Sequence, residues 1–154
     1  NVPGLHLYHD GQMEGKRVHQ PIQMVREPVE QPDEQAEAFY VRLLAYTHSP
    51  VLTEGNWRLL EPSPAGQGNG SGRGILAFAW SRGDRLEKLI VANYAASASQ
   101  ARIPIPGELL RADSLTLHDA LTDAVYPRSS SELAGSGLYV ALGPWQSHLF
   151  DVKE

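Results

Sequence analysis

Two carboxylates stand close together near the start of the chain, in the stretch His9-Asp10-Gly11-Gln12-Met13-Glu14-Gly15. A histidine beside paired carboxylates is a set of groups that general acid–base catalysis can use. Both carboxylates would share one exposed loop, and such a loop lacks the walls that push two pKa values apart. We therefore expect no independent acid–base site here, and solvated side chains with structural hydrogen bonds are the simpler interpretation.

Other reactive side chains fall short of known catalytic or metal-binding patterns. Four of the six histidines lie in the first third of the chain: His6, His9, His19 and His48. Their spacing fits no helix-borne zinc motif, and the chain has no cysteine to assist, so we predict no metal site. His118, Asp119 and His148 hint at a hydrolytic triad, but no serine sits in a nucleophile elbow. We assign no catalytic residue.

The three tryptophans differ in their surroundings. Trp80 ends an apolar run and Trp57 opens another, so both are expected in the core because of the surface they would bury. Trp145 follows Gly143-Pro144 in a turn. It is the best candidate for an exposed aromatic platform of the kind that stacks on sugar rings.

A strand, a loop and a helix are predicted in residues 1–54. Pro3-Gly4 indicates a turn, and residues 5–8 alternate as in a strand. The spacing predicts a helix over residues 32–47, with acidic residues at its start and a stop before Ser49-Pro50. Its apolar stripe consists of Ala36, Phe39, Tyr40, Leu43 and Leu44. Such a unit needs neighbours for its strand and cover for its helix, either from the rest of the chain or from another copy.

Residues 55–154 predict a mainly β domain. About seven short strands, at residues 57–61, 75–80, 86–94, 101–106, 115–118, 138–142 and 147–152, alternate with turn signals, which is typical of an antiparallel β-sandwich. Pro104 and Pro106 place the fourth strand on an edge. Residues 62–74, which include the glycine-rich stretch 66–74, match no nucleotide-binding loop and are expected to form a flexible hairpin connection.

Composition excludes several classes of partner. The chain has 154 residues, of which 42% are hydrophobic, and a net charge of −5. A core is therefore expected, while nucleic acid and anionic membranes would not be attracted. The absence of cysteine and of a signal-peptide pattern favours a cytoplasmic location. No cofactor motif is present.

Several short motifs, in this order, resemble the alpha-amylase family of glycoside hydrolases. The Pro-Gly turn, apolar strand and Gly-flanked loop ending in Glu14-Gly15 resemble the last barrel strand of that family, with one extra residue before the glutamate. Four later motifs resemble its C-terminal domain: Ile75 to Trp80, Ile90 to Tyr94, Asp119-Ala120-Leu121-Thr122 and Val140 to Pro144. Gly143, which separates Leu142 from Pro144, departs from the pattern.

The resemblance implies both a fold and a role. Residues 1–54 would be the remnant of the last βα unit of a (β/α)8 barrel, and residues 55–154 a Greek-key-like antiparallel sandwich. The family acts on α-glucosidic bonds, with carboxylates from earlier barrel strands. The chain alone is therefore expected to be an inactive C-terminal portion, whose partners are the missing catalytic barrel and, through it, an α-glucan or oligosaccharide.

The same resemblance gives the loop and Trp145 a substrate-binding interpretation. Loops at the C-terminal ends of barrel strands build the site in this architecture, so His9, Asp10, Gln12 and Glu14 would line the outer sugar cleft. Trp145 would add an aromatic platform. Two other classes of function stay open: a free-standing carbohydrate-binding module, and a structural domain that self-associates through residues 1–54.

Overall fold

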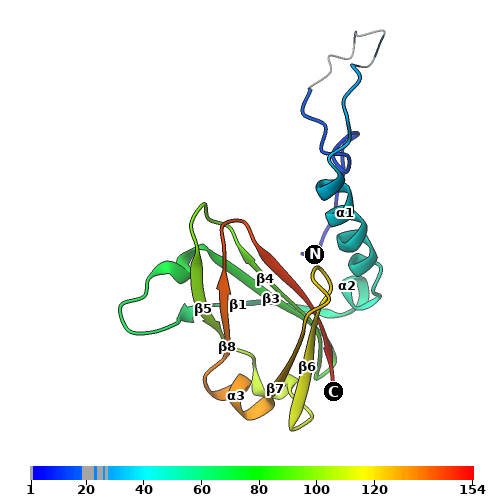
Figure 1. Ribbon diagram of the computed structural model, residues 1–154. Coiled ribbons are helices and arrows are strands. Elements are labelled where there is room, and N and C mark those ends of the chain that lie inside the picture. Colours follow the sequence, from blue (N-terminus) through cyan, green and yellow to red (C-terminus); the bar gives the residue numbers. More distant parts are fainter. Residues whose placement is uncertain (1, 19–22, 24–25, 27) are drawn as a thin grey trace.

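The computed structural model describes residues 2–18, 23, 26 and 28–154. Within these residues the chain is mainly β, with nine strands in two antiparallel sheets (Figure 1). The larger sheet has the order β1 (Asn56–Leu60), β3 (Ile75–Arg82), β4 (Arg85–Asn93), β9 (Ser147–Lys153), β6 (Ser114–Asp119) and β7 (Val125–Ser129). The smaller sheet has the order β2 (Ser63–Pro64), β5 (Ser99–Ile103) and β8 (Leu138–Leu142). We call residues 56–153 the two-sheet body.

The main core lies between the two sheets. Because successive residues of a strand point to opposite faces, alternate residues of the larger sheet face the smaller one. Leu89 and Val91 of β4 share one buried cluster with Val140 and Leu142 of β8. One end of this core is closed by Leu109 of the short helix η2 (Gly107–Leu109) and Leu133 of α3 (Ser130–Gly135).

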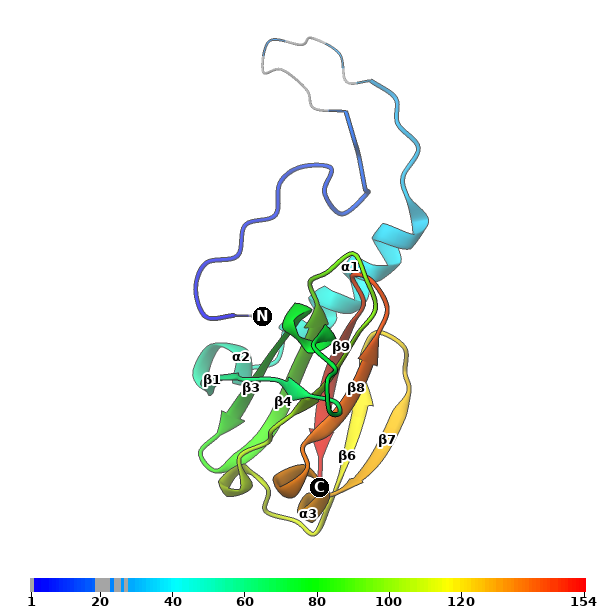
Figure 2. The same ribbon diagram turned by 90° about the vertical axis from the view of Figure 1, so that its left-hand side faces the viewer.

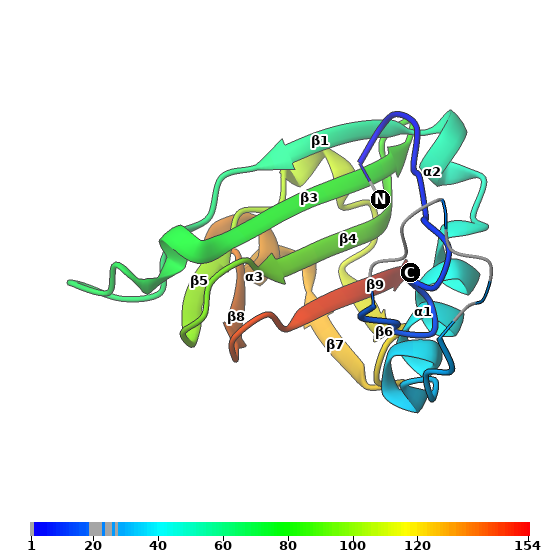
Figure 3. The same ribbon diagram turned by 90° about the horizontal axis from the view of Figure 1, so that it is seen from above.

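Two helices cover part of the opposite face of the larger sheet. They are α1 (Glu34–Thr47) and α2 (Val51–Glu54), and both lie on one side of the molecule in Figures 1 and 3. Tyr46 and Val51 are buried in a second cluster with four residues of the sheet: Phe78, Trp80, Ile90 and Leu149. The helix predicted at residues 32–47 therefore finds its cover within the chain, although only its C-terminal half is covered and Phe39 stays 41% exposed.

Asp33 sets the start of α1. Its side chain accepts hydrogen bonds from the backbone N–H groups of Gln35 and Ala36, and Glu34 and Glu37 lie in the first turn. These contacts satisfy free amide donors and place negative charge at the positive end of the helix dipole. The predicted helix is thus confirmed to within two residues. No helix of the described ranges has the length and apolarity that crossing a bilayer requires.

The strand predicted at residues 5–8 is wrong for this structure. Within the described residues the first strand is β1, and residues 2–18 run outside both sheets (Figure 2). Leu5 is 97% exposed and Leu7 is 85% exposed. A single extended segment without a neighbouring strand gains no cross-strand hydrogen bonds, so the sequence pattern alone does not produce a strand. His19 and Pro21, in the loop that follows, lie outside the described residues.

The edge position predicted for residues 101–106 is also wrong. β5 ends at Ile103 and pairs with both β2 and β8, so it is the central strand of the smaller sheet. Pro104 and Pro106 follow the strand and lead into η2. The prolines therefore end β5 without removing any of its ladder donors. The sequence did not predict β2, β7, α2 or α3.

Candidate functional site

The predicted carboxylate loop is a compact double turn. The backbone N–H of Gln12 donates to the carbonyl of His9 at 3.2 Å, and that of Lys16 donates to the carbonyl of Gly11 at 2.9 Å. Gly11 and Gly15 have φ values of +78° and +67°, a backbone region that favours glycine. The two glycines that flank the loop in sequence therefore allow its two reversals of direction.

This loop is attached to the start of α1. The side-chain amide of Gln12 donates to the hydroxyl of Tyr40 at 2.8 Å, and the backbone N–H of Asp33 donates to the carbonyl of Glu14 at 2.9 Å. A Cβ on Gly15 would lie 2.8 Å from the Cβ of Asp33, so only glycine permits this approach. Gln12 and the Glu14 backbone thus hold the loop in place.

His9 and Asp10 form the outer part of the loop. Both residues are exposed, and the Nδ1 atom of His9 lies 3.0 Å from the Asp10 carbonyl oxygen. An imidazole and a carboxylate in this position can offer hydrogen bonds to a polar ligand. The structure thus places His9, Asp10, Gln12 and Glu14 in the same loop. Gln12 and Glu14 contact α1 and the residue before it, whereas His9 and Asp10 lie farther out.

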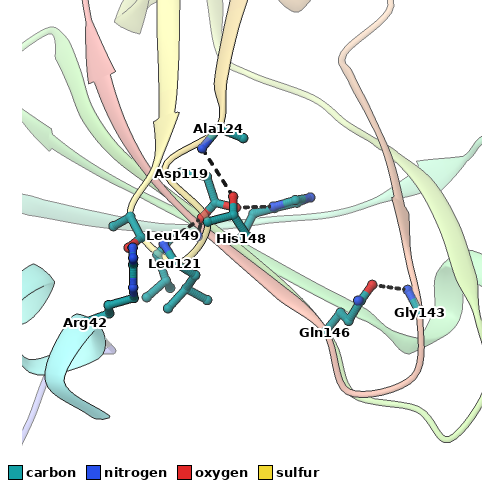
Figure 4. Close-up of polar contacts among 10 residues, drawn as sticks. Arg42, Asp119, Leu121, Ala124, Gly143, Gln146, His148 and Leu149 are labelled. Carbon is teal, nitrogen blue, oxygen red and sulfur yellow. Dashed lines mark hydrogen bonds and ion pairs between the residues drawn. The ribbon is translucent and has the colours of Figure 1, made fainter. Parts of the chain in front are cut away.

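Trp145 lies in a different part of the molecule. It belongs to the connection between β8 and β9, which lies on the far side of the body from α1 in Figures 1 and 3. In this connection the Gln146 side chain accepts a hydrogen bond from the Gly143 N–H at 2.7 Å (Figure 4). The structure therefore does not bring Trp145 together with the loop residues.

Trp145 instead pairs with an aromatic residue that the sequence analysis did not single out. The rings of Trp145 and Tyr94 are 5.8 Å apart between centroids, with an interplanar angle of 78°. Trp145 is 64% exposed and Tyr94 is 78% exposed, as expected for the platform candidate among the tryptophans. We call this pair the aromatic corner. Trp80 is buried as predicted, whereas Trp57 is 37% exposed beside Phe78.

Asp119 and His148 do meet, but in a structural arrangement (Figure 4). Asp119 is fully buried, and it accepts hydrogen bonds from Thr122, His148 and the backbone N–H groups of Leu121 and Leu149, at 2.8–3.2 Å. Burial raises the pKa of this carboxyl, but these hydrogen bonds outweigh it and leave the pKa below its ordinary value. The carboxylate therefore stabilises the turn between β6 and β7 through these hydrogen bonds.

Polar contacts pin α1 to the larger sheet. The side chain of Arg42 extends toward the same turn (Figure 4), and its guanidinium group pairs with the carboxylate of Asp123 at 2.8 Å. The Lys88 ammonium lies 2.6 Å from an Asp151 carboxylate oxygen and 3.7 Å above the ring of Tyr46. Burial, followed by the nearby carboxylates, raises the pKa of Tyr46 well above its usual range, so its hydroxyl stays a neutral donor.

A pocket of about 450 Å³ lies between α1 and these sheet residues. Its charged groups are already paired, because Arg42 meets Asp123 and Lys88 meets Asp151. Among the described residues, no group of three or more His, Asp or Glu side chains is arranged to hold a metal ion.

Comparison with known proteins gives no family for this chain. No family model matches it, and no match is found among curated proteins.

Proposed function

We propose that this chain is the non-catalytic C-terminal portion of an alpha-amylase-family enzyme that acts on α-glucosidic bonds. In this proposal the two-sheet body is a Greek-key-like accessory sandwich, and residues 1–54 complete a (β/α)8 barrel. One observation carries the proposal: the leucines of residues 5–8, in which apolar and polar residues alternate, are exposed, whereas the helix that follows them, α1, packs on the larger sheet. Leu5 and Leu7 are 97% and 85% exposed, whereas Tyr46 near the end of α1 is 4% exposed.

The exposed segment has the properties of a strand that lacks its sheet. Burying a leucine side chain is worth about 1.5–3 kcal/mol, so the pair leaves several kcal/mol of favourable burial unused. A barrel would supply a strand on each side and would bury both leucines. The described residues of this chain offer these leucines no such cover.

The proposed role is to stabilise the barrel and to present one of its loops. Gln12 and Glu14 attach the loop to α1, and α1 is fixed to the body through Tyr46 and Arg42. The exposed His9 and Asp10 would then face the sugar cleft at a fixed position. No residue of the chain is assigned to bond cleavage.

The test compares two polypeptides on α-glucans, with release of reducing ends as the measurement. This chain alone is expected to show none. The polypeptide obtained by extending the reading frame upstream is expected to be active, and Leu5→Asp with Leu7→Asp should lower that activity. Turnover by this chain alone, or an upstream frame without roughly 200–300 residues of barrel pattern, would overturn the proposal.

A second copy of the chain is the alternative cover for the exposed segment. Sedimentation separates the two possibilities. A dimer that Leu5→Asp with Leu7→Asp converts to a monomer would favour self-association through residues 1–54.

A further inference from the structure

The aromatic corner is formed where three connections meet at one end of the two-sheet body. The backbone N–H of Tyr94 donates to the carbonyl of Gly74 at 2.7 Å, and that of Trp145 donates to the carbonyl of Ala95 at 3.2 Å. These bonds tie together the glycine-rich stretch 66–74, the turn after β4 and the connection between β8 and β9. The two rings thus stand on backbone that is fixed by its neighbours.

A buried side chain adds further hydrogen bonds between the two connections that carry the aromatic residues. Asn93 is 2% exposed, and its amide donates to the carbonyls of Ser97 and Gly143 at 2.7 Å each. Its carbonyl oxygen accepts the N–H of Ala95 at 3.2 Å. Asn93 therefore joins the two connections that carry the rings, and ligand binding would need little reordering of the backbone.

Trp145 occupies a backbone position that glycine would fill more easily. The N–H of Gln146 donates to the carbonyl of Gly143 at 3.3 Å, which closes a turn with Pro144 and Trp145 at its centre. Trp145 has φ +59°, and the third residue of such a turn is usually glycine or asparagine. A bulky side chain there costs conformational energy, and an indole that is 64% exposed gains little burial in return. Strain of this kind is typical of functional positions.

The chemistry around the corner is polar but almost uncharged. Residues 66–74, 93–98 and 143–147 contain one charged side chain, Arg73, and no carboxylate. The same segments carry neutral amide and hydroxyl side chains, including those of Gln146 and Ser97. Such a surface offers hydrogen bonds to a neutral polar ligand, and without carboxylates it has no group that would recognise a cation.

We propose that the aromatic corner is a binding site for a neutral oligosaccharide. A hexopyranose ring has an apolar face of C–H groups and a rim of hydroxyls, which matches an aromatic face bordered by neutral hydrogen-bonding groups. The angle of 78° between the rings lets one sugar stack on Trp145 while the same sugar or its neighbour contacts Tyr94. The inference rests on this geometry alone, and only the choice of an α-glucan as first probe follows the proposed function.

The test is native affinity electrophoresis of this chain in gels that contain soluble starch or, separately, a soluble β-glucan. We expect retardation in at least one gel, and a loss of affinity of roughly tenfold or more for Trp145→Ala and for Tyr94→Ala. Tyr139→Ala is the matched control, because Tyr139 is a half-exposed aromatic on β8 outside the corner. Both corner residues are exposed, so their variants should keep the wild-type circular dichroism spectrum.

Three results would overturn the proposal: no retardation in either gel, unchanged retardation of Trp145→Ala, or equal losses in Tyr139→Ala. Binding of a proline-rich peptide at the corner without binding of either glycan would also overturn it, since another class of ligand would then occupy the rings. Failure of this test leaves the proposed enzyme role standing, because that role is measured by activity of the longer polypeptide.

Discussion

The backbone of Trp145 allows a comparison of two substitutions that remove the same ring. Trp145→Gly and Trp145→Ala both lose the contact with Tyr94, so that loss cancels between them. At φ +59° alanine retains a strain of about 1–2 kcal/mol that glycine lacks. Glycine loses about 0.5–1 kcal/mol more backbone entropy on folding. The glycine variant should therefore be more stable than the alanine variant by about 0.5–1 kcal/mol, measured by urea unfolding at pH 7.

Ala141→Gly is the control for this comparison. Ala141 is an exposed residue of β8 with strand geometry, so glycine there should cost about 0.5–1 kcal/mol. Glycine should therefore be more stable than alanine at position 145 and less stable than alanine at position 141. An alanine variant at Trp145 that equals or exceeds the glycine variant in stability would refute the argument for a strained turn. Neither variant should be retarded by starch, which would separate binding from stability.

Four further predictions concern the body and the exposed segment. Asp119→Ala should lower the free energy of unfolding in urea by about 3–5 kcal/mol, because buried hydrogen-bond donors lose their acceptor. The control, Asp123→Asn in the same turn, should cost less than about 1 kcal/mol, because it removes only an exposed ion pair. The pKa of Asp119 is lower in the folded chain than in the unfolded chain, where it is about 3.9. The ionised carboxylate therefore stabilises the fold above about pH 3.9, and this stabilisation should disappear as the pH falls through the folded pKa. Unfolding curves measured below about pH 4 would show the loss. Tyr46→Phe should cost about 1 kcal/mol in the same assay, because a carbonyl of β9 loses its donor. Leu5→Asp with Leu7→Asp should change the stability of this chain by less than about 0.5 kcal/mol by thermal or urea unfolding, since both leucines are exposed.

The elements that the sequence predicted well are those with strong local signals. The helix at residues 34–47 has an N-cap, acidic residues in its first turn and a regular apolar stripe, and it forms where these signals place it. The strands at 75–82 and 85–93 are long apolar runs joined by a tight turn. Their pairing is local in sequence, since the two strands are antiparallel neighbours along almost their whole length.

The errors come from features that depend on distant parts of the chain. Residues 5–8 have a strand pattern, but a strand requires a neighbour that the pattern does not supply. Pro104 and Pro106 suggested an edge strand because the sequence does not show that β5 ends before them, at Ile103. The sequence does not indicate Tyr94 as a site residue because it lies 51 positions before Trp145, and the contacts that bring the two together form only in the folded chain.

The position of α1 links the candidate loop to the body. The first half of α1 holds the loop through Tyr40 and the N-cap residue Asp33. The second half is attached to the body by Tyr46, which is buried against the larger sheet, and by Arg42, which pairs with Asp123. Any shift of the larger sheet would therefore move the loop with it. With these two attachments, α1 connects the two-sheet body to the segment that contains residues 5–8. In the proposed enzyme, the barrel would cover that segment. In that enzyme, the body would set the position of His9 and Asp10 through α1.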